Sequence, residues 1–295
     1  MRSSIALAMA ATASISVAGM SAAAPADGKE LVVLGDSFSA NAWMVDDHAV
    51  ECRHGDTSWP TRLSTLMGVA GTSNYADLSC PGASLDTPPS YTAGTETKQA
   101  DQAGAFGSRT KLVALQFGLN DRWGANDATM WYSLQHCVLD LVQGCGTEAA
   151  AQNRLVDSTQ LTGEKYADRL RGVITYIKYY APNARIMLVG YPEFFPGGRD
   201  SVCFNAFGVA RFVQPRGQAA IEALDRLDRA QREAAALLGV EFFDSRAATA
   251  GHGLCTDEPW LNGFQDPRNP DAIPFHPAAR GDEAVATGIR AQIGG

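Results

Sequence analysis

Three short motifs carry side chains that together could perform nucleophilic catalysis. Ser37 stands in the tripeptide GDS, Asn120 stands in the tetrapeptide GLND, and His276 lies near the C-terminus. A serine hydroxyl becomes a strong nucleophile when a base accepts its proton, and histidine titrates close enough to neutral pH for that task. A side-chain amide, with backbone N–H groups, can stabilise the oxyanion formed on an attacked carbonyl. These residue types predict a hydrolase, provided that the fold brings them together.

Each motif also has an ordinary structural explanation. A GDS tripeptide after a strand is often a turn whose aspartate caps a helix, and GLND could equally be a structural turn. A lone histidine before a helix is commonly a surface or capping residue. Catalysis is favoured only because the three motifs are expected to meet at one edge of a sheet.

The elements that must position these motifs follow from hydrophobic patterning. Short apolar runs predict strands over residues 31–34, 111–117, 185–189 and 240–243. Apolar residues at steps of three and four predict helices over residues 164–180 and 218–238, and an Ala-rich segment predicts one over 277–292. Strands that are apolar on both faces and alternate with helices predict a parallel sheet covered on both sides. Active sites of such sheets lie beyond the carboxyl ends of the strands, where GDS and GLND stand.

Three stretches lack this alternation of apolar strands and amphipathic helices. Residues 84–110 and 191–217 are rich in turn-forming residues and are predicted to be long surface loops, and residues 245–276 are also irregular. Five phenylalanines crowd the second stretch, where they either line an acyl groove or pack the loop onto the core. They are Phe194, Phe195, Phe204, Phe207 and Phe212. Trp43 and Trp123, which follow the first two motifs, either stack on a sugar, cover an acyl chain or simply pack against the core.

Composition excludes several classes of protein. The 295 residues are 45% hydrophobic and 19% charged, which excludes intrinsic disorder and a coiled coil. The 24 basic and 32 acidic residues give a net charge of −8, whereas nucleic-acid binding requires a basic field. No CxxC or HExxH motif supports a zinc site. We expect no nucleic-acid partner, no metal and no cofactor.

The N-terminal segment has the pattern of a secretory signal peptide. Arg2 precedes the small apolar stretch Ile5–Val17, and Ser21–Ala24 offers small-residue cleavage sites. The stretch is short for a membrane span, which needs roughly 20 apolar residues. We predict a signal peptide over residues 1–24, a single mature domain over residues 25–295, and export to the extracellular space or periplasm.

The cysteine content agrees with export. An even number of cysteines in an exported chain indicates disulfides. The six are Cys52, Cys80, Cys137, Cys145, Cys203 and Cys255. Cys137 and Cys145 are close in the sequence and easily joined, but spacing alone leaves the other pairings open.

Together the motifs resemble the SGNH, or GDSL, hydrolases over residues 31–293. GDS and GLND match two blocks of the family, and Gly82 in NYADLSCPGA matches the glycine of another. The resemblance implies a flavodoxin-like α/β/α fold and cleavage of carboxylic esters without a cofactor. It implies that Ser37 is the nucleophile and that His276 is the general base. The oxyanion hole would consist of the backbone N–H groups of Ser37 and Gly82 and the amide of Asn120.

The histidine motif departs from the family pattern. Members usually carry Asp-x-x-His, whose carboxylate orients the imidazole, but Ile273 stands three residues before His276 and Asp271 five residues before it. Either Asp271 reaches the imidazole by a different loop path, or the backbone carbonyl of Ile273 accepts the Nδ1 proton. We favour the carbonyl of Ile273 and hence a Ser–His dyad. We expect activity to fall as the imidazole protonates, near its ordinary pKa of about 6.5.

Secreted actinobacterial lipases and esterases of this family include such dyads and are similar to this chain in carrying six cysteines. Their consecutive pairing implies the disulfides Cys52–Cys80, Cys137–Cys145 and Cys203–Cys255. The resemblance makes lipid esters the first choice of substrate for a monomeric enzyme without stable membrane insertion. A carbohydrate acetyl esterase and a catalytically inactive exported binding protein are the alternatives.

Overall fold

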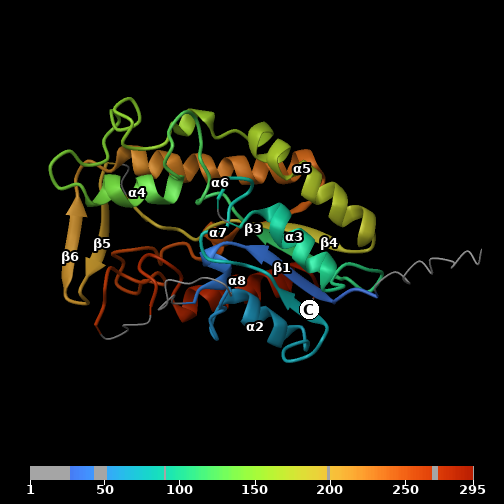
Figure 1. Cartoon of the computed structure of the whole chain (residues 1–295). Coiled ribbons are helices and arrows are strands. Elements are labelled where there is room, and N and C mark those ends of the chain that lie inside the picture. The colour runs from blue at the N-terminus through green and yellow to red at the C-terminus, as the bar shows by residue number, and fades with distance from the viewer. Residues whose placement is uncertain (1–26, 43–51, 90, 198–199, 268–271, 295) are drawn as a thin grey trace, which may run out of the picture.

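A five-stranded parallel sheet forms the centre of the molecule (Figure 1). The computed structural model describes residues 27–42, 52–89, 91–197, 200–267 and 272–294. The strands are β1 (Leu31–Gly35), β2 (Tyr75–Asp77), β3 (Leu112–Gln116), β4 (Arg185–Val189) and β7 (Glu241–Phe243). Their order is β2-β1-β3-β4-β7, and Val33 of β1 lies between Asp77 of β2 and Ala114 of β3. β1 therefore has a neighbour on each side.

The four strands predicted from apolar runs are all present. β1 and β3 are buried along their whole length, as expected of strands covered on both faces. β2 has only three residues, all half-buried. No apolar run marks it, because an edge strand this short buries too little surface to need one.

Helices cover both faces of the sheet and confirm the predicted three-layer α/β/α fold (Figure 1). On one face lie α3 (Ala93–Gln102), α5 (Gly163–Tyr180) and α6 (Gln218–Leu238); on the other lie α2 (Trp59–Leu66) and α8 (Ala279–Gln292). Val32 and Leu34 of β1 join the core on the α5 and α6 side. Leu31 and Val33 join the core beneath α2 and α8. This alternation follows from the two-residue period of a strand.

The structure corrects the prediction that residues 84–110 are a long surface loop, because they contain α3. The helix begins after Thr92, whose hydroxyl accepts the N–H of Thr95, and it buries Ala93, Glu96, Thr97 and Ala100. This spacing is helical, but the buried set includes a carboxyl and a hydroxyl. Hydrophobic periodicity therefore could not reveal it.

The second predicted loop, residues 191–217, also contains regular structure. β5 (Val202–Ala206) and β6 (Ala210–Gln214) form an antiparallel hairpin. It packs one face against the body, with Val202 and Phe204 buried, while residues of the opposite face are more exposed. The prediction of a long loop followed from the flanking Gly and Pro residues, and it overlooked the alternating apolar positions of residues 202–206, which are a strand signal.

Further elements surround the carboxyl ends of the sheet strands. They are α1 (Ser37–Ala40), α4 (Met130–Leu139), the 3₁₀ helix η1 (Ser158–Gln160) and α7 (Ser245–Ala248). α4 and the β5–β6 hairpin extend this end of the molecule (Figure 1). Gln214, the last residue of β6, donates from Nε2 to the carbonyl oxygens of Val138 (3.3 Å) and Asp140 (2.8 Å). The end of α4 is thereby tied to the hairpin.

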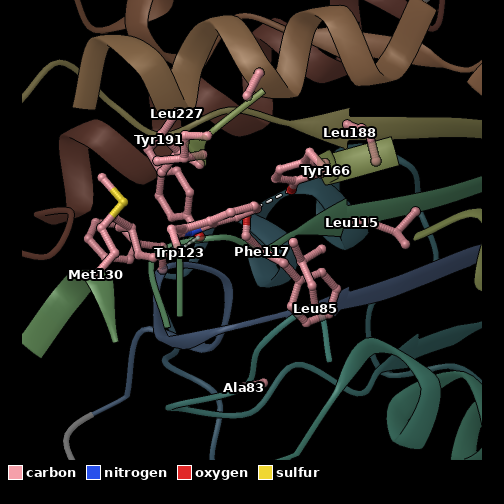
Figure 2. Close-up of a cluster of buried hydrophobic side chains, with 14 of the residues drawn as sticks. Ala83, Leu85, Leu115, Phe117, Trp123, Met130, Tyr166, Leu188, Tyr191 and Leu227 are labelled. Carbon is pink, nitrogen blue, oxygen red and sulfur yellow. Dashed lines mark hydrogen bonds between the residues drawn. The ribbon is translucent and has the colours of Figure 1, made fainter. Parts of the chain in front are cut away.

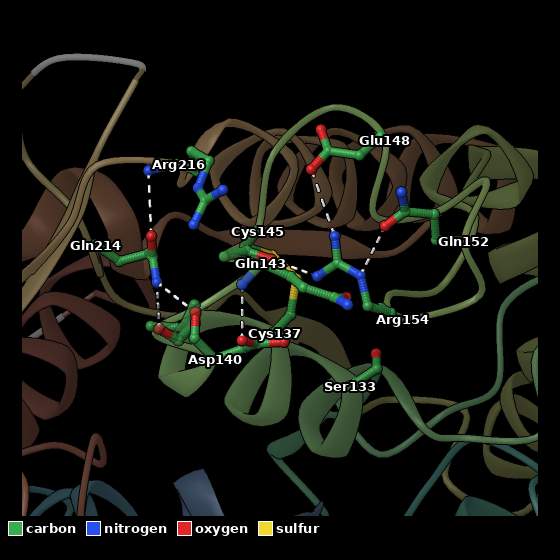
Figure 3. Close-up of a disulfide and its surroundings, with 12 residues drawn as sticks. Ser133, Cys137, Asp140, Gln143, Cys145, Glu148, Gln152, Arg154, Gln214 and Arg216 are labelled. Atoms are coloured by element: carbon green, nitrogen blue, oxygen red, sulfur yellow. Dashed lines mark hydrogen bonds and ion pairs between the residues drawn. A yellow bond between two sulfur atoms is a disulfide. The ribbon is translucent and has the colours of Figure 1, made fainter.

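Three disulfides are formed, and their pairs are those that the family resemblance implied: Cys52–Cys80, Cys137–Cys145 and Cys203–Cys255. The first holds the segment after β2, and the last joins β5 to the loop that precedes His276. Cys137–Cys145 closes the loop after α4 (Figure 3). In the same view Arg154 donates to Gln152 and contacts Glu148. The three bridges therefore lie in the segments around the carboxyl end of the sheet.

Candidate active site

Ser37 follows β1 directly and is the first residue of α1. The carboxylate of Asp36 accepts the backbone N–H of Phe38 at 2.9 Å and so caps this turn. A Cβ at Gly35 would lie 2.4 Å from Ser39 Oγ, closer than atoms of a side chain can approach. The GDS sequence thus provides a close turn, a cap and an outward hydroxyl in three consecutive residues.

The structure brings His276 against Ser37 although 239 positions separate them. His276 Nε2 lies 2.7 Å from Ser37 Oγ, and His276 Nδ1 lies 2.9 Å from the carbonyl oxygen of Pro274. A carbonyl oxygen only accepts hydrogen bonds, so Nδ1 carries the proton of the neutral ring. Nε2 is then the free base that accepts the hydrogen bond of the serine hydroxyl.

The prediction that Ile273 provides the orienting carbonyl is wrong by one residue. The carbonyl of Ile273 accepts the backbone N–H of His276 at 3.2 Å, closing a turn with Pro274 and Phe275 at its centre. It also accepts from Asn262 Nδ2 at 3.3 Å. Phe275 has φ +66°, and proline followed by a positive φ is the pattern of a type II turn. This turn occupies the carbonyl of Ile273 and presents that of Pro274.

Asp271, the alternative orienting residue, lies outside the described residues. Trp43, which followed the first motif, also lies outside them. Trp123 is described and is buried, with its ring stacked on Tyr166 at 6.1 Å and its Nε1 donating to Gly118 O at 3.0 Å. Its position agrees with the packing alternative.

The imidazole of His276 is enclosed by aromatic rings. It is 3% exposed, stacks on the ring of Phe38 with centroids 4.2 Å apart and planes inclined by 23°, and meets Trp131 edge to face at 5.3 Å. Burial lowers the pKa of His276 to about 4, while the hydrogen bond to Pro274 acts in the opposite direction. The ring is therefore neutral well below pH 6.5, where the sequence alone placed its titration.

Gly82 and Asn120 stand on the two sides of the nucleophile. Gly82 follows β2 and Asn120 follows β3, and these strands flank β1. Gly82 has φ +81°, and a Cβ there would meet nothing within 4 Å. Asn120 Nδ2 donates to Ala83 O at 3.1 Å, which joins the two loops. One of its two amide protons remains for a substrate oxygen.

A buried hydrogen-bond network links the ends of three strands beneath this site. Tyr191, two residues after β4, donates its hydroxyl proton to Asp36 Oδ2 at 2.5 Å and accepts the N–H of Leu119 at 3.3 Å. Burial raises the pKa of Asp36 to about 7. Sequence reasoning missed Tyr191, although its place directly after a predicted strand was a usable signal.

Asp121 performs a similar structural task in the GLND motif. Its fully buried carboxylate accepts the backbone N–H of Leu85 at 3.0 Å and the hydroxyl of Thr87 at 3.1 Å, and it pairs with Arg169 of α5 at 2.5 Å. Figure 2 shows the apolar cluster around this region, in which Tyr166 donates to Phe117 O at 2.7 Å. Polar contacts and tight packing together fix the loops that carry Gly82 and Asn120.

An apolar pocket lies beside the aromatic rings that enclose His276. Its lining side chains are apolar except for Gln135: Trp131, Leu134, Val138, Leu139, Phe194, Phe195, Phe204, Leu224, Leu254 and Phe275. Trp131 contacts the His276 ring, and Phe194 meets Phe38 at 5.7 Å. The pocket is therefore separated from the His276 ring by a single side chain and is bounded by α4, α6 and β5.

The five loop phenylalanines have different environments. Phe194, Phe195 and Phe204 line the pocket, and Phe212 packs on Phe204 at 4.7 Å. Phe207, at the hairpin turn, is half exposed. Three members of the group therefore line an apolar pocket, and Phe212 packs within the hairpin.

Comparisons with known proteins agree with this fold. Residues 33–284 match the GDSL-like Lipase/Acylhydrolase family. A protein of Streptomyces coelicolor named Lipase 1 is 30% identical over 262 residues, which cover 88% of this chain and 85% of that protein. The chain therefore belongs to the GDSL-like lipase/acylhydrolase family. It is a carboxylic ester hydrolase.

Solved structures share the fold. Phospholipase A1 from Streptomyces albidoflavus has a TM-score of 0.61 and 22% identity, with 90% of this chain and 99% of that chain covered. The extracellular lipase from Streptomyces rimosus has a TM-score of 0.60 and 23% identity, with the same coverage. The similarity thus extends over nearly the whole described chain.

Two further observations concern the described part of the chain. No three His, Cys, Asp or Glu side chains within it are grouped as a metal-binding cluster. None of its helices combines the length and the apolar character that a membrane crossing requires.

Proposed function

We propose that the protein is an exported lipase or esterase in which Ser37 is the nucleophile and His276 the general base. The observation that carries the proposal is the hydrogen-bonded chain from Ser37 Oγ to His276 Nε2 and from Nδ1 to Pro274 O. Such a chain leaves the basic nitrogen facing the hydroxyl. It is the arrangement that nucleophilic catalysis by serine requires.

The reaction proceeds in two halves. Ser37 Oγ attacks the ester carbonyl carbon while its proton passes to His276 Nε2, and the imidazolium then gives that proton to the departing alcohol. Water attacks the acyl-serine with His276 again as base, which releases the carboxylic acid and restores Ser37. The backbone N–H groups of Ser37 and Gly82 and the Asn120 amide donate to the oxyanion in both halves.

A main-chain carbonyl takes the place of the usual carboxylate behind the imidazole. The carbonyl dipole of Pro274 fixes the tautomer, but it stabilises the imidazolium less than a carboxylate does. The face of the Phe38 ring, 4.2 Å from the imidazole, adds attraction once the ring becomes a cation. The Pro274 carbonyl and the Phe38 ring face both favour the imidazolium that forms during the reaction, whereas burial opposes it.

The apolar pocket favours lipid esters over acetylated carbohydrates. Ten of its eleven lining residues are apolar, whereas a sugar would require several hydrogen-bonding side chains. Trp131 and Phe194 line the pocket and pack against His276 and Phe38, so an acyl chain held there would lie close to the catalytic pair.

We further propose a signal peptide over residues 1–24 and a monomeric mature domain over residues 25–295, with the three disulfides formed on export.

Hydrolysis of p-nitrophenyl esters from acetate to palmitate tests this function. We expect turnover by the mature protein on medium and long chains, and loss of turnover in Ser37→Ala with an unchanged circular dichroism spectrum. A strong preference for acetate would favour the carbohydrate acetyl esterase. Absence of turnover on every ester by a folded protein would favour the inactive binding protein.

A further inference from the structure

A second hollow lies against the apolar pocket. It shares Phe194, Phe195 and Leu224 with the apolar pocket. These three side chains therefore have the apolar pocket on one side and the second hollow on the other. They form a common wall between two neighbouring spaces.

The three members of the wall differ in what else they support. Phe194 is buried and packs against Phe38 and Trp131, at 5.7 and 6.2 Å, so it belongs to the support of the catalytic pair. Phe195 and Leu224 are half-buried, and each is held by apolar contacts. Phe195 comes from the segment after β4 and Leu224 from α6. Only these two can be shortened without removing a ring that contacts Phe38.

The space beyond the wall is suited to a hydrocarbon chain along much of its surface. Pro192, Ile221 and Leu227 line it, together with the shared side chains. Six of its ten lining side chains are apolar. Among the polar ones, Arg246 pairs with Asp225 at 2.6 Å, and Gln231 donates from Nε2 to Phe117 O at 3.0 Å while its Oε1 has no hydrogen-bond partner among the described residues.

We propose that Phe195 and Leu224 close the apolar pocket on this side and thereby set the upper limit of acyl chain length. The proposal rests on the proposed function, since it assigns the acyl chain to the apolar pocket. Shortening either side chain opens the wall and gives longer acyl chains access to the second hollow. Each additional methylene buried there raises kcat/KM by about fourfold, the equilibrium factor that corresponds to burial of one CH₂.

The test compares chain-length profiles of kcat/KM on p-nitrophenyl esters from C4 to C18 for wild type, Phe195→Ala and Leu224→Ala. The quantity compared is the ratio of the longest-chain value to the C4 value. We expect this ratio to rise about 15-fold when two further methylenes are accommodated, and the optimum to move to longer chains. Phe195→Trp, which thickens the wall, should move the optimum to shorter chains and provides a second test if a truncated variant does not fold.

Ile221→Ala is the matched control, because Ile221 lines only the second hollow. It enlarges that hollow behind an intact wall and should leave the profile as in wild type. The proposal would be overturned if both truncated variants kept the wild-type profile, or if their profiles changed only as much as that of Ile221→Ala. Serine-dependent turnover in these experiments would still support the proposed function. Absence of serine-dependent turnover in wild type would overturn both.

Discussion

The catalytic edge and the apolar pocket are held by different kinds of contact. The catalytic edge is the set of proposed catalytic residues Ser37, Gly82, Asn120 and His276, and it depends on hydrogen bonds such as His276 Nδ1 to Pro274 O at 2.9 Å. The apolar pocket is lined by α4, α6 and β5 and depends on packing, with disulfides behind two of its walls. Changes at the edge should affect all esters alike, whereas changes at the pocket should discriminate between chain lengths.

After replacement of Ser37, the largest loss of kcat is expected from a change in the oxyanion hole. Asn120→Ala removes an amide donor and should lower kcat about 10²- to 10³-fold on acetate and palmitate esters alike. Steady-state kinetics on both esters measures this. Asn126→Ala, a neighbouring amide outside the catalytic edge, should remain within about twofold of wild type. A loss confined to long-chain esters would contradict the role of Asn120.

The pH dependence of the reaction follows from the burial of His276. The base works only when neutral, and its pKa is lowered to about 4, so kcat/KM should fall as the pH decreases through about 4. At pH 5 about nine tenths of the imidazole would then be neutral, against about one thirtieth for an ordinary pKa near 6.5. Initial rates between pH 4 and 8, with recovery checked at pH 7, distinguish the two. An acid limb centred at 6.5 would refute the effect of burial.

Removal of a single hydroxyl group tests the network beneath the edge. Tyr191→Phe leaves the Asp36 carboxyl and the Leu119 N–H without their shared partner. We expect kcat to fall about tenfold for all chain lengths and the free energy of unfolding to fall by about 1–3 kcal/mol. Tyr132→Phe, on an exposed side chain, is the matched control for denaturant melts and kinetics. Equal behaviour of the two variants would show that the network does not position Ser37.

The smallest effect on turnover, and one that differs between chain lengths, is expected where the end of α4 lines the apolar pocket. Replacing Cys137 and Cys145 together by serine releases the end of α4, which carries Val138 and Leu139 into the pocket. We expect loss of about 2–3 kcal/mol of stability and a few-fold lower kcat/KM on palmitate, with a smaller change on acetate. Equal losses of kcat/KM on palmitate and acetate esters would instead indicate that this disulfide acts on the catalytic edge.

Much of the fold could be predicted because burial leaves a mark on the sequence. β1 and β3 are apolar on both faces, and α5 and α6 show helical periodicity, so their positions were evident. α3 was missed because its buried face includes Glu96 and Thr97. The β5–β6 hairpin was missed because the Gly and Pro residues around it suggested a loop, although the alternating burial of β5 is a strand signal.

Part of the candidate site could likewise be predicted from the sequence, and part could not. Ser37, Asn120 and His276 were marked by residue type and by their places near strand ends or a helix. The orienting carbonyl was placed at Ile273, but a main-chain acceptor is selected by turn geometry, which side-chain identity does not encode. Here the turn through Phe275 uses the carbonyl of Ile273 and leaves that of Pro274 to the imidazole.

Covalent labelling by a fluorophosphonate tests the central claim most directly. The reagent should form one adduct, mapped by mass spectrometry to the peptide that contains Ser37, and labelling should be absent in Ser37→Ala and at least about 10³-fold slower in His276→Ala. An adduct on another serine, or labelling of folded His276→Ala at the wild-type rate, would contradict a Ser37–His276 pair as the catalytic centre.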